Sequence, residues 1–216
     1  MRNSICYAFA LLVLFFCTMP LQAQKLGLEG GINTSTMANN LDFGSTIEFE
    51  VRTNFQVGLW GELPLGDTWG IRPSLLYIRK GAQNDPDINQ GVATNINYEY
   101  LDIPLLAYFG RGTVQFRLGG ALGIPLNHFL YLPGTNEKVD NPIAVEVWET
   151  GLNFSLMGGV AFRFQRFHIS AQYQYALTPT LKDLLFTDVN GEVIKEENGA
   201  HHRNILISLG YTLWEK

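Results

Sequence analysis

Two segments of the chain carry residue types whose spacing could support chemistry. His168 and Ser170 stand two positions apart, and a serine beside a histidine can act as a nucleophile–base pair for acyl transfer if a carboxylate orients the histidine. Asp85 and Asp87 open a stretch that runs to Gly91, and carboxylates at alternate positions can point at one calcium ion. The calcium pattern is incomplete, because its glycine comes one position late and no carboxylate stands at the twelfth position. A polar loop tip is the simpler interpretation.

The elements that would position these residues are β-strands, because apolar and polar residues alternate with a period of two. The clearest stretch has apolar side chains at 167, 169, 171, 173 and 175 and polar ones at 168, 170, 172 and 174. Eight such stretches of about 10–14 residues recur, where a tilted transmembrane strand needs about 9–11. Their connections alternate between short (66–67, 110–112, 165–166) and long (36–51, 83–96, 128–149, 179–201). This pattern is typical of bacterial outer-membrane barrels. We therefore predict an all-β fold, an eight-stranded antiparallel up-and-down transmembrane β-barrel over residues 24–216.

The face opposite the apolar one carries charged residues. In a soluble β-sandwich this face would be solvated, which is the alternative interpretation. A narrow eight-stranded barrel would enclose it, and enclosed charges must pair because burying an unpaired ion is costly. Acids and bases are nearly balanced there, with Lys80 among the bases. We predict a filled interior with a structural ion-pair network made of Glu29, Glu62, Arg72, Asp102, Arg117, Arg163 and His168.

The same alternation turns His168 and Ser170 inward, and no glutamate is placed to orient the histidine in the sequence. We therefore predict no catalytic, cofactor or metal site and no enzymatic activity.

The first 23 residues have the pattern of a cleaved signal peptide. Arg2 precedes an apolar run, and Leu21-Gln22-Ala23 resembles a cleavage site. Both cysteines of the chain, Cys6 and Cys17, fall within this segment. The mature chain would thus have no disulfide and no cysteine-ligated zinc or iron–sulfur site. With 15 basic and 20 acidic residues, the chain lacks the basic balance that a nucleic-acid partner requires.

Three segments resemble a known family. They are residues 26–33 (LGLEGGIN), residues 98–106 (YEYLDIPLL) and the glycine-rich residues 116–123 (FRLGGALG). They are similar to strands of the PorT-like outer-membrane β-barrel family of Bacteroidetes, and the similarity extends over nearly all of the mature chain. The chain departs from such barrels at its end, where Glu215 and Lys216 follow Trp214. The resemblance implies a multi-pass protein of the cell outer membrane. It also suggests a role near a protein-secretion apparatus, in whose assembly the founding member of the family is implicated.

These observations favour a non-enzymatic barrel that is structural or an interaction partner in envelope assembly or protein secretion. The alternative is a narrow channel or a small-ligand or lipid-binding barrel. A lipid A-modifying hydrolase is a third possibility, because an eight-stranded lipid A deacylase uses a His-x-Ser pair on a strand. The expected partners are outer-membrane lipid, lipopolysaccharide and envelope or secretion proteins. We expect extracellular long loops and two periplasmic termini. The long loops hold most of the acidic residues, which either solubilise them or bind lipopolysaccharide through divalent cations.

Overall fold

The computed structural model describes residues 25–39, 49–84, 95–110, 112–131, 138–139, 151–179, 184–187, 193–196 and 200–215. The signal peptide predicted over residues 1–23 and the calcium-like stretch 85–91 lie outside the described residues. Within the described ranges, no helix is long and apolar enough to cross a membrane.

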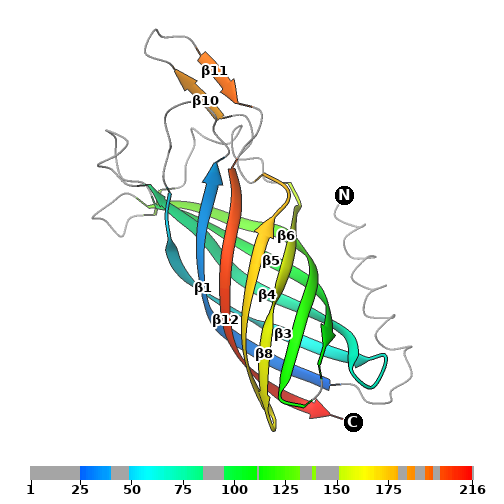
Figure 1. Ribbon diagram of the computed structural model, residues 1–216. Helices are drawn as coiled ribbons and strands as arrows, with labels where there is room; N and C mark the ends of the chain where they lie inside the picture. Colours follow the sequence, from blue (N-terminus) through cyan, green and yellow to red (C-terminus); the bar gives the residue numbers. More distant parts are fainter. Residues whose placement is uncertain are drawn as a thin grey trace, which may run out of the picture.

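Eight long strands form one closed antiparallel sheet. They are β1 (Lys25–Asn39), β3 (Arg52–Pro64), β4 (Trp69–Asn84), β5 (Asn95–Phe109), β6 (Val114–Tyr131), β8 (Asn153–Phe164), β9 (Phe167–Ala176) and β12 (Ala200–Glu215). Each strand pairs with its neighbour in this order, and β1 pairs with β12 to close the barrel. Figure 1 shows this closure, with the first strand (blue) beside the last (red). The predicted eight-stranded barrel is confirmed.

The two ends of the barrel differ. At one end, here called the turn end, the short connections 65–68, 110–113 and 165–166 join neighbouring strands. Gln165 has a φ of 53°, and this left-handed conformation suits a tight hairpin between β8 and β9. The start of β1 and the end of β12 lie together at this end (Figure 1).

The opposite end, here called the loop end, carries the short strands. Two of them extend the barrel wall, with β2 (Phe49–Glu50) paired to β4 and β7 (Lys138–Val139) paired to β6. The other two, β10 (Leu184–Thr187) and β11 (Val193–Glu196), pair only with each other, beyond the end of the barrel (Figure 1).

Side chains alternate between the interior and the outer wall along each strand. On β9, every even-numbered residue from His168 to Ala176 is buried, and the odd-numbered residues are exposed or half-buried. This follows from the pleat, which sends successive side chains to opposite faces. The predicted inward and outward faces therefore agree with the burial pattern over most of the barrel.

Three expectations need correction. Five of the eight barrel strands are longer than about 10–14 residues, since β1 and β5 have 15, β4 and β12 have 16 and β6 has 18. The other three, β3, β8 and β9, have 13, 12 and 10. Asn127 is exposed, although strict alternation from the inward Gln115 and Arg117 predicts an inward side chain for it. A register shift opposite Glu99 and Tyr100 inserts Leu126 as an extra residue, and such a bulge exchanges the two faces beyond it. Strict alternation from the outward Val57 and Leu59 predicts Leu63 on the outer face, but it is buried near the turn end.

Candidate functional site: the polar interior of the barrel

The interior near the turn end is organised around Arg72. This guanidinium donates from Nη1 to Glu62 Oε1 and from Nη2 to Glu29 Oε2, each at 2.9 Å. Its Cζ lies 4.0 Å from the centroid of the Trp60 ring. Arg72 is only 1% exposed, and its charge is compensated by two carboxylates and an aromatic face. A buried cation needs this degree of compensation to be tolerated.

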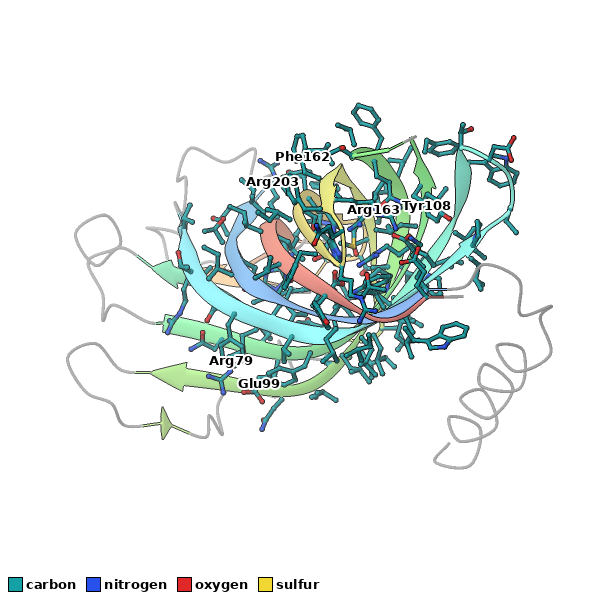
Figure 2. The ribbon with its side chains drawn as sticks, turned by 90° about the horizontal axis from the view of Figure 1, so that it is seen from below. Arg79, Glu99, Tyr108, Phe162, Arg163 and Arg203 are labelled. Atoms are coloured by element: carbon teal, nitrogen blue, oxygen red, sulfur yellow. The ribbon has the colours of Figure 1, made fainter. Side chains whose placement is uncertain are left out.

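Two further guanidiniums approach Glu62 from the other side of the barrel. Arg163 Nη2 donates to Glu62 Oε2 at 2.7 Å. Arg117 Nη2 lies 3.9 Å from Glu62 Oε1, while its Nε donates to Gln115 Oε1 at 2.9 Å. The turn-end cluster therefore places three guanidiniums around two carboxylates. Figure 2 shows Arg163 next to Tyr108, and both line a small hollow of about 230 Å³ at the mouth of the turn end.

Two ring side chains of this cluster lie over glycines of the neighbouring strand. Trp60 is paired with Gly27, and His168 is paired with Gly210. A Cβ built on Gly27 would lie 2.4 Å from the Trp60 ring, and one on Gly210 would lie 1.9 Å from the ring of His168. Only glycine leaves room for these rings. The two glycines thus position the rings, whose edges meet at a centroid distance of 5.1 Å.

His168 contacts both Arg72 and Glu29. Its Nε2 lies 3.1 Å from Arg72 Nη2 and 3.5 Å from Glu29 Oε2. A guanidinium only donates, so Nε2 can accept from Arg72 when the ring carries its proton on Nδ1, and it can donate to Glu29 when Nε2 carries the proton. No glutamate was expected to orient His168, but Glu29 lies beside its Nε2. The two residues come from β1 and β9, with β12 between them in the sheet.

A second polar cluster fills the interior toward the loop end. Lys80 Nζ donates to Asp102 Oδ2 at 2.7 Å, and Gln174 Nε2 donates to the same oxygen at 2.9 Å. Gln174 also accepts a hydrogen bond from Asn204 Nδ2 at 2.9 Å. Lys80 Nζ lies 4.8 Å from the centroid of the Tyr100 ring. This loop-end cluster thus contains one buried ion pair of formal charge zero, held by amide side chains.

An apolar belt lies between the two clusters, formed by residues of four neighbouring strands, β4, β5, β6 and β8, and by one residue of β12. Its members are buried, and on their strands they lie between inward residues of the turn-end and loop-end regions: Leu76, Leu106, Ala121, Met157 and Leu206. Polar residues of β3, β9 and β12 complete the middle of the interior. Gln56 Nε2 donates to Ser208 Oγ at 2.6 Å, and Gln172 Nε2 donates to Ser170 Oγ at 3.3 Å. The middle of the interior is therefore occupied by side chains on all sides.

The structure divides the seven residues proposed from the sequence between these clusters. Six of them lie together at the turn end: Glu29, Glu62, Arg72, Arg117, Arg163 and His168. Asp102 lies in the loop-end cluster with Lys80, which the proposed set did not include. The set also missed Trp60 and Gln174. An inward position on a polar face was the available signal for Gln174, whereas nothing local marks Trp60 as the partner of Arg72.

The interior shows no arrangement that resembles a catalytic or metal centre among the described residues. Ser170 accepts a hydrogen bond from Gln172, and Nε2 of His168 lies against Arg72 and Glu29. In the described part of the chain, no group of three or more histidine, cysteine, aspartate or glutamate side chains could hold a metal ion. The chemistry that the interior visibly provides is charge pairing and hydrogen bonding.

The outer wall is the apolar counterpart of this interior. Large apolar side chains cover it with much of their surface exposed, for example Leu118 at 65% and Leu209 at 56%. Within the described parts of the eight barrel strands, outward charges occur only toward the loop end, at Arg79, Glu99 and Arg203. Glu215 pairs with Lys25 at the turn end, and both line the hollow at the mouth of the barrel. On β12 the apolar run from Ile205 to Leu213 spans eight steps. At about 3.3 Å per residue and a tilt of about 40°, it rises about 20 Å, close to the apolar band of an outer-membrane barrel.

A closed barrel with a polar interior and an apolar band on its outer wall defines an outer-membrane β-barrel protein. The chain belongs to the family described as "Outer membrane protein beta-barrel domain", whose model matches residues 22–182. This assignment places the protein in the outer membrane. No curated protein sequence matches the chain.

Solved structures with the same fold include Neisserial surface protein A. It is 12% identical, with a TM-score of 0.52, and the match covers 87% of this chain and 97% of that one. Two others match with lower TM-scores. The attachment invasion locus protein Ail of Yersinia pestis has 12% identity, a TM-score of 0.47 and coverage of 89% and 100%. Outer membrane protein W of E. coli has 13% identity, a TM-score of 0.44 and coverage of 90% and 100%.

Proposed function

We propose that the protein is a non-enzymatic barrel that acts as a structural or interaction protein of the outer membrane, in envelope assembly or protein secretion. One observation carries this proposal: the interior is occupied by charged side chains buried against one another and by the apolar belt. Eight strands leave an interior that side chains can fill. A barrel without a conduit acts through the surfaces at its two ends and through its wall.

The partners that we propose for the protein would contact the two ends of the barrel. The resemblance to the PorT-like family supports envelope or secretion proteins as partners. A cleaved signal peptide over residues 1–23 would export the chain, with the long loops extracellular and both termini periplasmic. Acidic long loops at the cell surface would meet lipopolysaccharide through divalent cations. In this account the seven interior residues have a structural role and hold the strands in register.

Conductance in planar bilayers tests the filled interior. We expect residues 24–216, refolded and inserted, to give no stable conductance steps. Arg117→Ala should introduce small steps, because it removes a large, fully buried side chain beside Glu62. Stable steps from the wild type would contradict the proposal and favour the narrow channel. The Glu215→Gln variant is a suitable control, because it changes a charge at the turn-end rim and removes no interior side chain.

Crosslinking in the cell tests the interaction role. A photoreactive residue would be placed at Asp67 on the turn end and, in a second variant, at Asn127 toward the loop end; both positions are exposed. We expect the same few envelope proteins to be recovered reproducibly from the outer-membrane fraction with at least one variant. A photoreactive residue at Leu209, in the apolar band, is the matched control and should crosslink lipid only. Recovery of the barrel alone from both end variants would contradict the interaction role.

The lipid A hydrolase interpretation has a direct test. His168 and Ser170 face the interior, and the acyl chains of a lipid substrate would lie along the outer wall. We expect purified wild-type protein to release no fatty acid from lipid A. Release by the wild type that is abolished in the His168→Ala variant would establish the enzyme instead.

A further inference from the structure

The outward charges near the loop end fall into two groups. Arg79 is neutralised, because its Nη2 and Nε donate to Glu99 Oε1 at 2.7 and 2.9 Å on the neighbouring strand. Its Cζ also lies 5.1 Å from the centroid of the Phe55 ring. Arg203, on β12, has no carboxylate partner among the described residues. Figure 2 shows the Arg79–Glu99 pair together and Arg203 well apart from it.

The surroundings of Arg203 are polar and aromatic. Its Cζ lies 5.8 Å from the centroid of Tyr175, the residue paired with it on β9. On its other side it is paired with Thr36 of β1. The Tyr175 ring stacks on His201, with centroids 6.1 Å apart and planes at 4°. His201 Nδ1 is 3.0 Å from the carbonyl oxygen of Ala176, so this nitrogen donates and Nε2 faces away. Hydrogen-bonding side chains therefore flank a cation on the outer wall.

The height of this group on the wall decides what it meets. Arg203 lies two positions before the apolar run 205–213 in the sequence, on the side of the run that faces the loop end. Ten residues at about 3.3 Å and a tilt of about 40° place it about 25 Å above Leu213. That height equals the apolar band of an outer-membrane barrel, so Arg203 lies where the acyl chains end and the lipid headgroups begin. Aromatic side chains such as Tyr175 are typical of this interface.

We propose that the wall around Arg203, Tyr175, His201 and Thr36 binds the phosphate group of an anionic lipid in the leaflet at the loop end. A guanidinium on an exposed wall recognises phosphate through paired N–H donors. The Tyr175 hydroxyl can add a donor from the neighbouring strand β9. The chain as a whole has a formal charge of −5 and would repel such a lipid. An unpaired cation at headgroup height supplies the local attraction that the net charge lacks. This inference rests on the proposed function, because it names the lipid contact of the same barrel.

The test measures lipid selectivity at the wall. Residues 24–216 would be inserted into phosphatidylcholine vesicles that contain spin-labelled phosphatidic acid or spin-labelled phosphatidylcholine, and the motionally restricted fraction would be quantified by electron paramagnetic resonance. A basic side chain near a membrane surface contributes about 1 kcal/mol with anionic lipid, so we expect about fivefold selectivity for phosphatidic acid, lost in Arg203→Gln. The double variant Arg79→Gln/Glu99→Gln keeps the net charge and should retain the selectivity.

The outcomes separate this proposal from the proposed function. Equal selectivity of Arg203→Gln and the wild type would overturn the lipid site, as would loss of selectivity in the double variant alone. A drop caused by millimolar inorganic phosphate, but not by chloride of the same ionic strength, would support recognition of the phosphate group. An equal drop with both salts would overturn the site and indicate unspecific charge attraction. If the wild type inserts and stays silent in bilayers but shows no selectivity, the lipid site fails and the filled barrel stands. If the wild type gives conductance steps but keeps its selectivity for phosphatidic acid, the filled barrel fails and the lipid site stands.

Discussion

The inner and outer faces of the same strands place opposite demands on their side chains. On β9 the inward residues are His168, Ser170, Gln172 and Gln174, and apolar or aromatic residues alternate with them on the outer wall. The inward groups are buried and need partners on other strands. The outward groups need only an apolar surrounding, which hydrocarbon provides. The stability of the barrel should therefore depend on the specific partners of each inner residue. For an outer residue it should depend only on the polarity of the side chain and on its height in the membrane.

The largest loss of stability should come from breaking the centre of the turn-end cluster. Arg72→Met keeps much of the side-chain volume but leaves Glu29 and Glu62 without their main partner. Removing one member of a buried ion pair costs about 3–5 kcal/mol in the free energy of unfolding. Urea unfolding in lipid vesicles, followed by tryptophan fluorescence, measures it. Glu215→Gln alters a half-exposed pair with Lys25 and should change stability by less than about 0.5 kcal/mol.

The next largest effect belongs to the outer face. Leu209→Arg puts a charge in the middle of the apolar run on β12, where it should cost about 2–4 kcal/mol. The same unfolding measurement applies. Thr34 of β1 is two positions from Thr36, the residue paired with Arg203, and so lies near the membrane interface. Thr34→Arg should cost about 1 kcal/mol or less, because charge is tolerated near the interface. Equal costs at the two positions would contradict the assigned height of the band.

The Lys80–Asp102 pair tests whether inner partners act together. Lys80→Met and Asp102→Asn should each destabilise the barrel, because each leaves its buried partner uncompensated. The double variant should be less destabilised than the sum, with a coupling energy of about 1–3 kcal/mol. Additive losses would show that the two side chains do not depend on each other.

The smallest of these effects concerns the glycine beneath a ring. Gly210→Ala would place a Cβ 1.9 Å from the ring of His168, which must move away from Arg72. Because a side chain can shift, we expect a cost of about 1–2 kcal/mol, near the lower end for overpacking. Gly30→Ala is the matched control, since its Cβ would meet only ordinary contacts at 3.6 Å and beyond. A similar loss in both variants would point to a backbone effect instead.

The sequence was sufficient to predict the fold because its main signal is local. Alternation with a period of two reports the face of each residue, and short turns report which strands are neighbours. The partners across the barrel were not predictable in this way. Arg72 meets Glu29 across 43 residues, and His168 meets Glu29 across a strand that lies between their own. Such contacts depend on the stagger at which the sheet closes, which no single segment encodes.

Local irregularities account for the other differences. One extra residue in β6 was enough to move Asn127 from the predicted inner face to the outer one. The pairing of Lys80 with Asp102 joins two residues that the sequence had placed on the inner face, but the register of β4 and β5 decides which neighbours meet. The sequence therefore predicts which face of the barrel wall a residue lies on better than it predicts which interior side chains contact each other.

The most direct test of the central claim is a spin-label scan along β9. The chain without residues 1–23 has no cysteine, so single cysteines at positions 167 to 174 carry the label without background. We expect labels at 167, 169, 171 and 173 to collide with oxygen dissolved in the bilayer, and labels at 168, 170, 172 and 174 to be shielded from both oxygen and a water-soluble nickel reagent. Access of the nickel reagent to the even positions would contradict a filled interior, and access to the odd positions would contradict a wall that faces lipid.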